Sequence, residues 1–392
     1  MTMTTVPYVL DDRRQALRAA AVDLAPELRA HALALDTDPG DVKAIADLAA
    51  FDLIRALTTP TDFAACPLRI EGFEYPPGSC LDEAVCVVEL AAGDAGVLLA
   101  GPGPGLSGVL VDNLADQAQR ERFYRAVADG TTWTFFAVTE PGRGSDAGAM
   151  DTELRRDGVD VYRLHGAKRY IGNGARGRLG VVFGRTGPGP LSIRAALLEV
   201  PAEGFAAIAL DMVGLRGAGI SELRFDGVAV PEQSLLGGRL PVTRRGLWGA
   251  MRVFHQMRAQ VAALAIGTGI ALVDLVAAER PGAPRLDEFA DRLRSGRHLV
   301  YAAAAALDAD PDDGHRASAA KASATALGRE ISRWAIGALD PAALVEQPLL
   351  EKWARDVLAF EFMEGTTNIQ RRHLAREYLK RRAPVGPAGG RP

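Results

Sequence analysis

The feature that most constrains the fold of this chain is a change in its hydrophobic period, from helical to strand-like and back to helical. Apolar residues recur at three-and-four spacing from about residue 11 to 130 and again after about residue 240. Between them, short runs rich in β-branched and aromatic residues are separated by Gly, Pro and Asp. This order predicts an α+β protein, because a doubly wound sheet would alternate strands and helices along the chain.

The pattern divides the chain into regions. We expect an N-terminal helical domain at 1–130, a middle β domain at 131–239, a C-terminal helical bundle at 240–382 and a disordered tail at 383–392, which is rich in Gly and Pro. Within the bundle, helices are expected at 244–280, 286–307, 314–339, 349–363 and 368–382. A chain of 392 residues can bury a large core.

Composition narrows the class of protein. A net charge of −4, with acids and bases mixed along most of the chain, argues against the basic stripe of a nucleic-acid binder. Cys66, Cys80 and Cys86 are odd in number and lack CxxC spacing, so we expect free thiols that serve as small core residues, although a thiol role stays open. The first residues include acids and no apolar run of the signal-peptide kind, which predicts a cytoplasmic protein.

Two patterns invite interpretations that their context disfavours. Residues 261–278 are long and apolar enough to span a membrane, but Asp274 and the small residues around it favour a buried bundle helix and no membrane. Residues 103–108 read G-x-G-x-x-G, which would suit a dinucleotide-binding strand and helix. The flanking residues are as helical as they are extended, so we expect a turn between two helices.

Glu364 is the strongest candidate for a catalytic side chain. Counting back at helical spacing gives Phe360, Val357 and Trp353, so we expect its carboxylate to lie on the apolar face of one helix. Desolvation would raise its pKa toward the range of a general base. The alternatives are a solvated surface acid, or an acid that favours the start of the following helix.

Two segments of the β region each begin as a strand and become a polar turn. The first runs from Phe136 to Asp146 and presents Thr139 and Ser145, and the second runs from Gly166 to Gly174. Either segment taken alone is typical of an ordinary β-turn.

Together with two further blocks, these segments resemble the acyl-CoA dehydrogenase family of flavoproteins. The blocks are VTEPGRGSD (138–146), HGAKRYIGNG (165–174), GLRGAGISELRFDGVAVPEQSLLG (214–237) and MEGTTNIQRRHLAREYL (363–379). They occur in family order and spacing, and the likeness extends over about residues 10–382. The resemblance implies a helical domain, a middle β-barrel domain and a helical bundle, with FAD between the barrel and the bundle and an acyl thioester against the flavin.

The resemblance also implies roles for single residues. It implies that Glu364 is the catalytic base that takes the α-proton, while the β-hydride passes to FAD. Substrate contacts are expected from Ser145, Arg258 and Gly365. Cofactor contacts are expected from Phe136, Val138, Thr139, Ser145, Tyr170, Ile171, Gly172, Arg280, Thr366 and Asn368. No metal ligand is expected.

Some family members carry the base on an earlier helix, at the position of Met257. Since Met257 cannot accept a proton, Glu364 is the stronger candidate. His255 and Glu361 are the reserve candidates, and a structural role is expected for each.

The chain departs from the family pattern at three places. Gly172 replaces a Thr, so only a backbone N–H is expected near the flavin N5. The loop that reaches FAD phosphates is shortened to residues 280–284, and residues 334–341 replace a Gln-x-x-Gly-Gly segment that contacts FAD across a subunit interface. The usual tetramer is therefore in doubt, and a homodimer or a homotetramer is expected.

These departures suggest a specialised branch, such as relatives in polyketide pathways that act on acyl groups bound to acyl carrier protein. The basic side chains of Arg371, Arg372, Arg376, Lys380, Arg381 and Arg382 could dock such an acidic carrier, or could be a solvated helix face. The expected electron acceptor is a flavoprotein or O2. A flavin-dependent oxidase or oxygenase and a flavin-free scaffold protein remain the alternatives.

Overall fold

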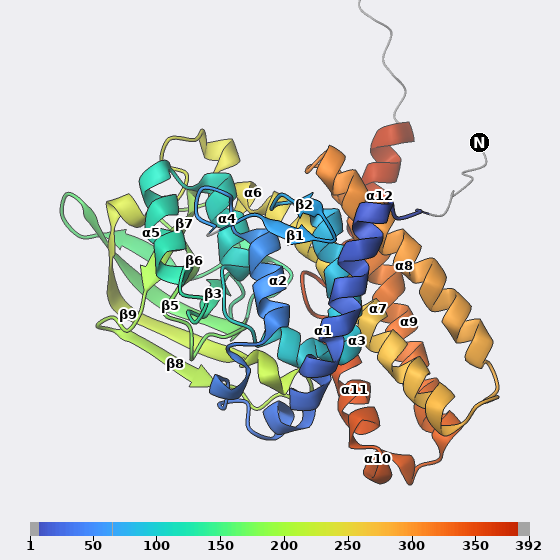
Figure 1. Cartoon of the computed structure of the whole chain (residues 1–392). Coiled ribbons are helices and arrows are strands. Elements are labelled where there is room, and N and C mark those ends of the chain that lie inside the picture. Colours follow the sequence, from blue (N-terminus) through green and yellow to red (C-terminus); the bar gives the residue numbers. More distant parts are fainter. Residues whose placement is uncertain (1–7, 65, 383–392) are drawn as a thin grey trace, which may run out of the picture.

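The computed structural model describes residues 8–64 and 66–382, and its elements follow the predicted order of helices, sheet and helices. The sheet stands at the left of Figure 1 and the C-terminal helices at the right, with α1 and α3 between them. The expected tail at 383–392 lies outside the described residues.

The N-terminal region is helical apart from a short antiparallel hairpin that the helical pattern did not predict. Its elements are α1 (Asp12–Thr37), α2 (Ala49–Thr58), β1 (Leu68–Ile70), β2 (Phe73–Tyr75), α3 (Cys80–Leu99), α4 (Gly105–Leu114) and α5 (Gln117–Val127). Gly103 lies in the turn between α3 and α4. A helix therefore precedes the glycine motif, and the dinucleotide-binding interpretation is wrong.

The middle region is a mixed sheet. Its strands are β3 (Thr134–Ala137), β4 (Glu153–Arg156), β5 (Val161–Ile171), β6 (Leu179–Arg185), β7 (Ile193–Glu199), β8 (Phe205–Ala209) and β9 (Ser221–Pro231). The strand order is β3-β6-β4-β5-β9-β8, with β7 paired to β6. Among the described residues no pairing joins β8 to β3, so the expected barrel is a curled open sheet.

Two cysteines, Cys80 and Cys86, are buried as expected, whereas Cys66 is exposed.

The C-terminal region packs its helices around α7. The elements are α6 (Gly246–Gly249), α7 (Met251–Glu279), α8 (Leu286–Ala309), α9 (Gly314–Leu339), α10 (Ala343–Glu346), α11 (Pro348–Ala359) and α12 (Thr367–Arg382). Helix α7 is apolar and long enough to cross a membrane, but 72% of that stretch is buried, and α3, α8 and α9 pack against it. A Cβ at Gly267 would collide with the carbonyl oxygen of Val88, so glycine permits the close crossing of α7 and α3.

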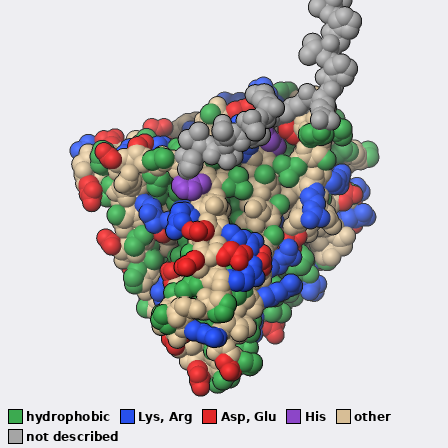
Figure 2. Space-filling view, turned by 90° about the vertical axis from the view of Figure 1, so that its right-hand side faces the viewer, with side chains coloured by type: hydrophobic (Ala, Val, Ile, Leu, Met, Phe, Trp, Pro, Cys, Tyr) green, Lys and Arg blue, Asp and Glu red, His purple; other side chains and the backbone are tan. Residues whose placement is uncertain are grey.

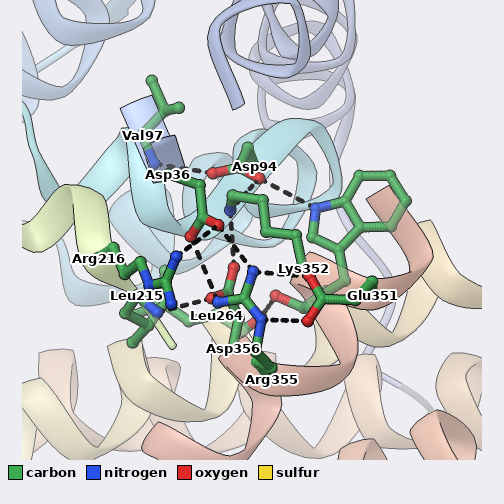
Figure 3. A network of polar contacts seen from close by, with 12 residues as sticks. Asp36, Asp94, Val97, Leu215, Arg216, Leu264, Glu351, Lys352, Arg355 and Asp356 are labelled. Atoms are coloured by element: carbon green, nitrogen blue, oxygen red, sulfur yellow. Dashed lines mark hydrogen bonds and ion pairs between the residues drawn. The ribbon is translucent and has the colours of Figure 1, made fainter. Parts of the chain in front are cut away.

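A buried ionic network joins the N-terminal helices to α11 (Figure 3). The Lys352 Nζ lies 2.6 Å from Asp94 and 2.7 Å from Asp356. Asp94 has non-helical dihedrals inside α3, and its carboxylate accepts a hydrogen bond from the N–H of Val97, where the helix resumes. Asp356 accepts from the N–H of Leu215 at 2.6 Å. The network therefore fixes α11 against both α3 and the loop before β9.

Candidate active site

Glu364 lies in the turn between α11 and α12. Trp353, Val357 and Phe360 are buried as predicted. The placement of Glu364 on the same helix is wrong, because α11 ends at Ala359 and Glu364 has a left-handed backbone, with φ of +53°. A non-glycine residue in this region is uncommon and persists only where the surroundings enforce it.

The turn is shaped by the start of α12. The Glu361 carboxylate accepts hydrogen bonds from the N–H of Thr367 at 2.8 Å and from its hydroxyl at 2.6 Å. Burial alone would raise the pKa of Glu361, but these hydrogen bonds and nearby cations outweigh it and lower the pKa. The other reserve candidate, His255, has its Nδ1 3.3 Å from the carbonyl oxygen of Pro311, and burial lowers its pKa. Both contacts support the structural roles expected for these side chains.

Side chains from three helices donate hydrogen bonds to the backbone carbonyls of Glu364 and Gly365. Arg258 of α7 donates through Nε to the Glu364 carbonyl at 3.3 Å, and Lys321 of α9 donates to the Gly365 carbonyl at 2.6 Å. Gln370 of α12 donates to both carbonyls, at 3.1 and 2.8 Å. Among the described residues, the backbone N–H of Glu364 has no backbone acceptor. The turn therefore presents an available donor beside a carboxylate.

The surroundings of Glu364 are electropositive. Burial raises the pKa of its carboxyl, and the charges of Arg258 and Lys321 oppose that rise. Burial lowers the pKa of Arg258 to about 10 and that of Lys321 to about 8. Burial, with Arg258 as the next cause, lowers the pKa of His373 to about 4. An anion formed beside Glu364 would therefore meet the positive charges of Arg258 and Lys321, whereas His373 is neutral near pH 7.

The two polar turns of the β region lie together. The Lys168 ammonium donates to the Val138 carbonyl at 2.9 Å and pairs with Glu140 at 3.0 Å. The N–H of Arg169 donates to the Thr139 carbonyl at 2.8 Å. The backbone at the end of β5 is strained, since Tyr170 has φ of +64°. Tyr170 is also 55% exposed.

Two chains of contacts link this part of the sheet to the Glu364 turn. Phe136 meets Phe254 of α7 edge-to-face with ring centroids 6.2 Å apart, one turn before Arg258. On the other side, the N–H of Asn173 donates to the Ala218 carbonyl, and the loop that carries Ala218 is held by Asp356 of α11. The sheet and the turn therefore meet across α7 and α11.

Of the remaining predicted residues, most lie near the sheet or the Glu364 turn, whereas Arg280 lies apart from them. Ile171 is buried, Gly172 and Thr366 are partly buried, and Ser145 and Asn368 are exposed. Arg280 caps the far end of α7, about 33 Å from Arg258 at 1.5 Å per residue. There it donates to the Ala338 carbonyl at 2.7 Å and lines an open cleft of about 400 Å³ together with residues 337–341. The structure therefore does not bring Arg280 to Glu364 within one chain.

Comparison with known proteins identifies the family. Residues 135–228 match the acyl-CoA dehydrogenase middle domain, and residues 226–379 match the C-terminal domain. The short-chain specific acyl-CoA dehydrogenase of rat mitochondria is 31% identical over 281 residues, covering 66% of this chain and 67% of the relative. The chain belongs to the acyl-CoA dehydrogenase family.

Other relatives carry reductase names. The caffeyl-CoA reductase-Etf complex subunit CarC of Acetobacterium woodii is 28% identical, covering 78% of this chain and 84% of the relative. The 3-(aryl)acrylate reductase of Clostridium sporogenes is also 28% identical, covering 75% and 81%. Butyryl-CoA dehydrogenase of Megasphaera elsdenii has the same fold, with a TM-score of 0.83 at 24% identity over 95% of this chain and all of that one.

The family comparison supports an oxidoreductase that acts on CH–CH bonds, and family members use FAD. The residues present fit such a group. Arg258 is 4% exposed, yet its Nη1 has no hydrogen-bond partner among the described residues. Tyr170, at the end of β5, and Phe362, in the turn that carries Glu364, are large rings that stay 55% and 74% exposed. A flat ring and an anionic tail would cover these groups.

Sequence reasoning missed Lys321 and Gln370. Both side chains are fully buried and donate hydrogen bonds to the Gly365 carbonyl. A signal was present for Lys321, because it lies among Ala317, Ala320 and Ala324 at the spacing of a buried helix face.

Proposed function

We propose that this protein catalyses FAD-dependent α,β-dehydrogenation of an acyl thioester, with Glu364 as the base. The observation that carries the proposal is the partly buried Glu364 carboxylate, whose pKa burial raises, beside its own available N–H in a turn held by side chains of three helices. Bound FAD would accept the hydride from the β-carbon. Val138, Thr139, Tyr170, Ile171 and Gly172 would border its ring.

The residues of this chain would supply the proton chemistry. The Glu364 carboxylate would take the α-proton, and the Glu364 N–H would donate to the thioester oxygen as negative charge develops there. The positive charges of Arg258 and Lys321, which already act on Glu364, would stabilise that charge. Because burial raises the pKa of Glu364, its carboxyl holds the accepted proton more readily than an ordinary acid.

The reverse reaction is the second candidate function. A protonated Glu364 could return a proton to the α-carbon of an unsaturated thioester, and two relatives of 28% identity are named as reductases. Mixing reduced protein with unsaturated thioesters tests this direction, since it predicts return of the oxidised flavin colour.

The finer assignments are also proposals. Arg371, Arg372, Arg376 and Lys380 are exposed on α12 and would attract an acidic acyl carrier protein or CoA phosphates, whereas the side chains of Arg381 and Arg382 lie outside the described residues. The side of the molecule in Figure 2 instead shows acids and bases interspersed. The remote Arg280 cleft suits the FAD of a second copy, which supports a homo-oligomer. An electron-transfer flavoprotein or O2 would reoxidise the flavin.

Replacement of Glu364 tests the central assignment. Glu364→Gln should bind FAD normally but lose bleaching of the flavin by acyl thioesters, by roughly 10³-fold or more in rate, because the amide cannot accept the proton. The matched control is Glu203→Gln, which neutralises an exposed carboxylate of the sheet region. Undiminished bleaching in Glu364→Gln would refute the assignment. A panel of acyl-CoA and acyl-carrier thioesters would identify the carrier.

A further inference from the structure

Lys321 is a buried lysine without a matching carboxylate. Its side chain is fully buried on α9, and among the described residues no acid lies within ion-pair distance of its ammonium. Burial of an ammonium is costly unless it is paired and hydrogen-bonded. Because burying this ammonium is costly, we expect a specific role for Lys321.

The contacts of Lys321 span the catalytic turn. Its Nζ donates to the Glu361 carbonyl at 3.1 Å and to the Gly365 carbonyl at 2.6 Å. These carbonyls stand at the two ends of the 361–365 turn, with Glu364 between them. In the described part of the chain, Arg258 and Gln370 contact only the Glu364–Gly365 end. Lys321 is therefore the side chain that ties one end of the turn to the other.

The turn needs such a tie because its backbone is strained. Glu364 and Gly365 both have positive φ, of +53° and +93°. A Cβ at residue 365 would lie 3.1 Å from Ile369 and 3.2 Å from the Gln370 amide, so the turn is also closely packed against α12. Backbone of this kind relaxes when the groups that enforce it are removed.

We propose that Lys321 is a positioning residue for the reaction: its ammonium closes the 361–365 turn and directs the Glu364 carboxylate and N–H at the thioester. The role rests on the proposed function of Glu364. It also has an electrostatic part, since a nearby ammonium favours the ionised form of Glu364.

Other charges also act on this ammonium. Glu361 and Glu364 face it from the turn, Arg258 faces it from α7, and Arg329 lies on its own helix. From α12, Gln370 contacts the same carbonyl, and His373 lies near Arg258. The two acids stabilise the ammonium and the two arginines oppose it. Because Arg258 remains after removal of Lys321, the expected change in the Glu364 pKa is partial.

The test compares Lys321→Met, which removes charge and donor, with Lys321→Arg, which keeps both. The first readout is the Glu364 carboxyl titration, followed by NMR of glutamate-labelled protein and assigned by its loss in Glu364→Gln. We expect the midpoint to rise by about one pH unit in Lys321→Met and to stay near the wild-type value in Lys321→Arg. The second readout is kcat/KM, which should fall roughly 10- to 100-fold in Lys321→Met, mainly through kcat.

Thr325→Val is the matched control. Thr325 lies one turn along α9 and is buried. Within the described part of the chain its hydroxyl donates to the Lys321 carbonyl alone, so its loss perturbs the helix and not the turn. Lys321→Gln is a second uncharged variant if Lys321→Met folds poorly. An unmoved Glu364 midpoint in the uncharged variants, or an equal shift in Thr325→Val, overturns the proposal. If Glu364→Gln still bleaches the flavin, the proposed function fails, while the midpoint shift still decides the effect of Lys321 on the turn.

Discussion

Two buried lysines, Lys352 and Lys321, occupy contrasting surroundings in the same helical bundle. Lys352 meets two carboxylates within 2.7 Å, and although burial alone would lower its pKa, Asp94 and Asp356 raise it. Lys321 meets two backbone carbonyls, and burial lowers its pKa to about 8. Around Lys352 carboxylates compensate the charge of the ammonium, and the ion pairs join α3 to α11. Around Lys321 no carboxylate pairs with the ammonium among the described residues, and the nearby Glu364 is the residue that would receive a proton.

The contrast separates a structural ion cluster from a chemical one. Perturbed ionisable groups occur in both kinds of site, so a shifted pKa alone does not identify a catalytic centre. What distinguishes the Lys321 region is the strained turn, the available N–H of Glu364 and the unpartnered Nη1 of Arg258. In the Lys352 network each carboxylate also accepts a backbone N–H.

The largest effect expected from this comparison is on stability. Lys352→Met should lower the free energy of unfolding by about 3–5 kcal/mol, because Asp94 and Asp356 would stay buried without their cation. Lys321→Met should cost much less, since it strands no carboxylate. Urea denaturation of both variants measures the difference. Lys43→Met, at an exposed position, is the control. Equal losses in the two buried variants would break the comparison.

A second prediction concerns pH. The pKa of Lys321 is about 8 in the folded chain and 10.5 for an ordinary lysine, so the unfolded state binds the extra proton between these values. The Lys321 contribution to stability should therefore rise with pH in this window. The raised pKa of Lys352 acts oppositely, and its stabilisation is lost only above 10.5.

Unfolding free energies at about pH 7.5 and about pH 10 would show the rise. Lys168 also has a pKa of about 8, so wild type must be compared with Lys321→Met rather than read alone. An identical pH dependence in both proteins would contradict the low pKa of Lys321.

The smallest effect is expected at Gly172, where the sheet meets the loop held by the Lys352 network. A Cβ there would lie 3.9 Å from the Ala218 carbonyl oxygen, so Gly172→Thr should fit and change stability by less than about 1 kcal/mol. The threonine hydroxyl should shift the flavin absorbance or redox potential. Gly174→Thr is the contrasting control, because its Cβ would lie 2.9 Å from Ser221. A large loss of stability in Gly172→Thr would show that Gly172 belongs to the structural region around the Lys352 network as well as to the predicted flavin site.

Much of the architecture could be predicted because hydrophobic period reports which face of an element is buried. The bundle helix expected at 314–339 matches α9, and the one expected at 368–382 begins one residue after the start of α12. The β1–β2 hairpin was missed, since strands of three residues are too short to show alternation. Closure of the sheet was overestimated because pairing between distant strands leaves no periodic signal.

The identity of Glu364 could be predicted, but its conformation could not. The apolar spacing of Trp353, Val357 and Phe360 continues in register to Glu364, although the helix ends at Ala359. The left-handed turn is stabilised by hydrogen bonds from Arg258 and Lys321, which lie far away in the chain, and from Gln370 of the following helix. Arg280 was expected beside the cofactor, but it lies at the end of α7 remote from Arg258, where the helix predicted at 244–280 also ends.

The helix break at Asp94 also has a consequence for folding during synthesis. Its carboxylate finds its lysine 258 residues later in the chain, at Lys352. A ribosome-bound fragment that stops short of α11 would carry an unmatched acid in the middle of α3, together with the apolar surface that α7 and α8 later cover. We therefore expect that the N-terminal third does not fold stably by itself, which truncation or circular permutation between the two residues would test.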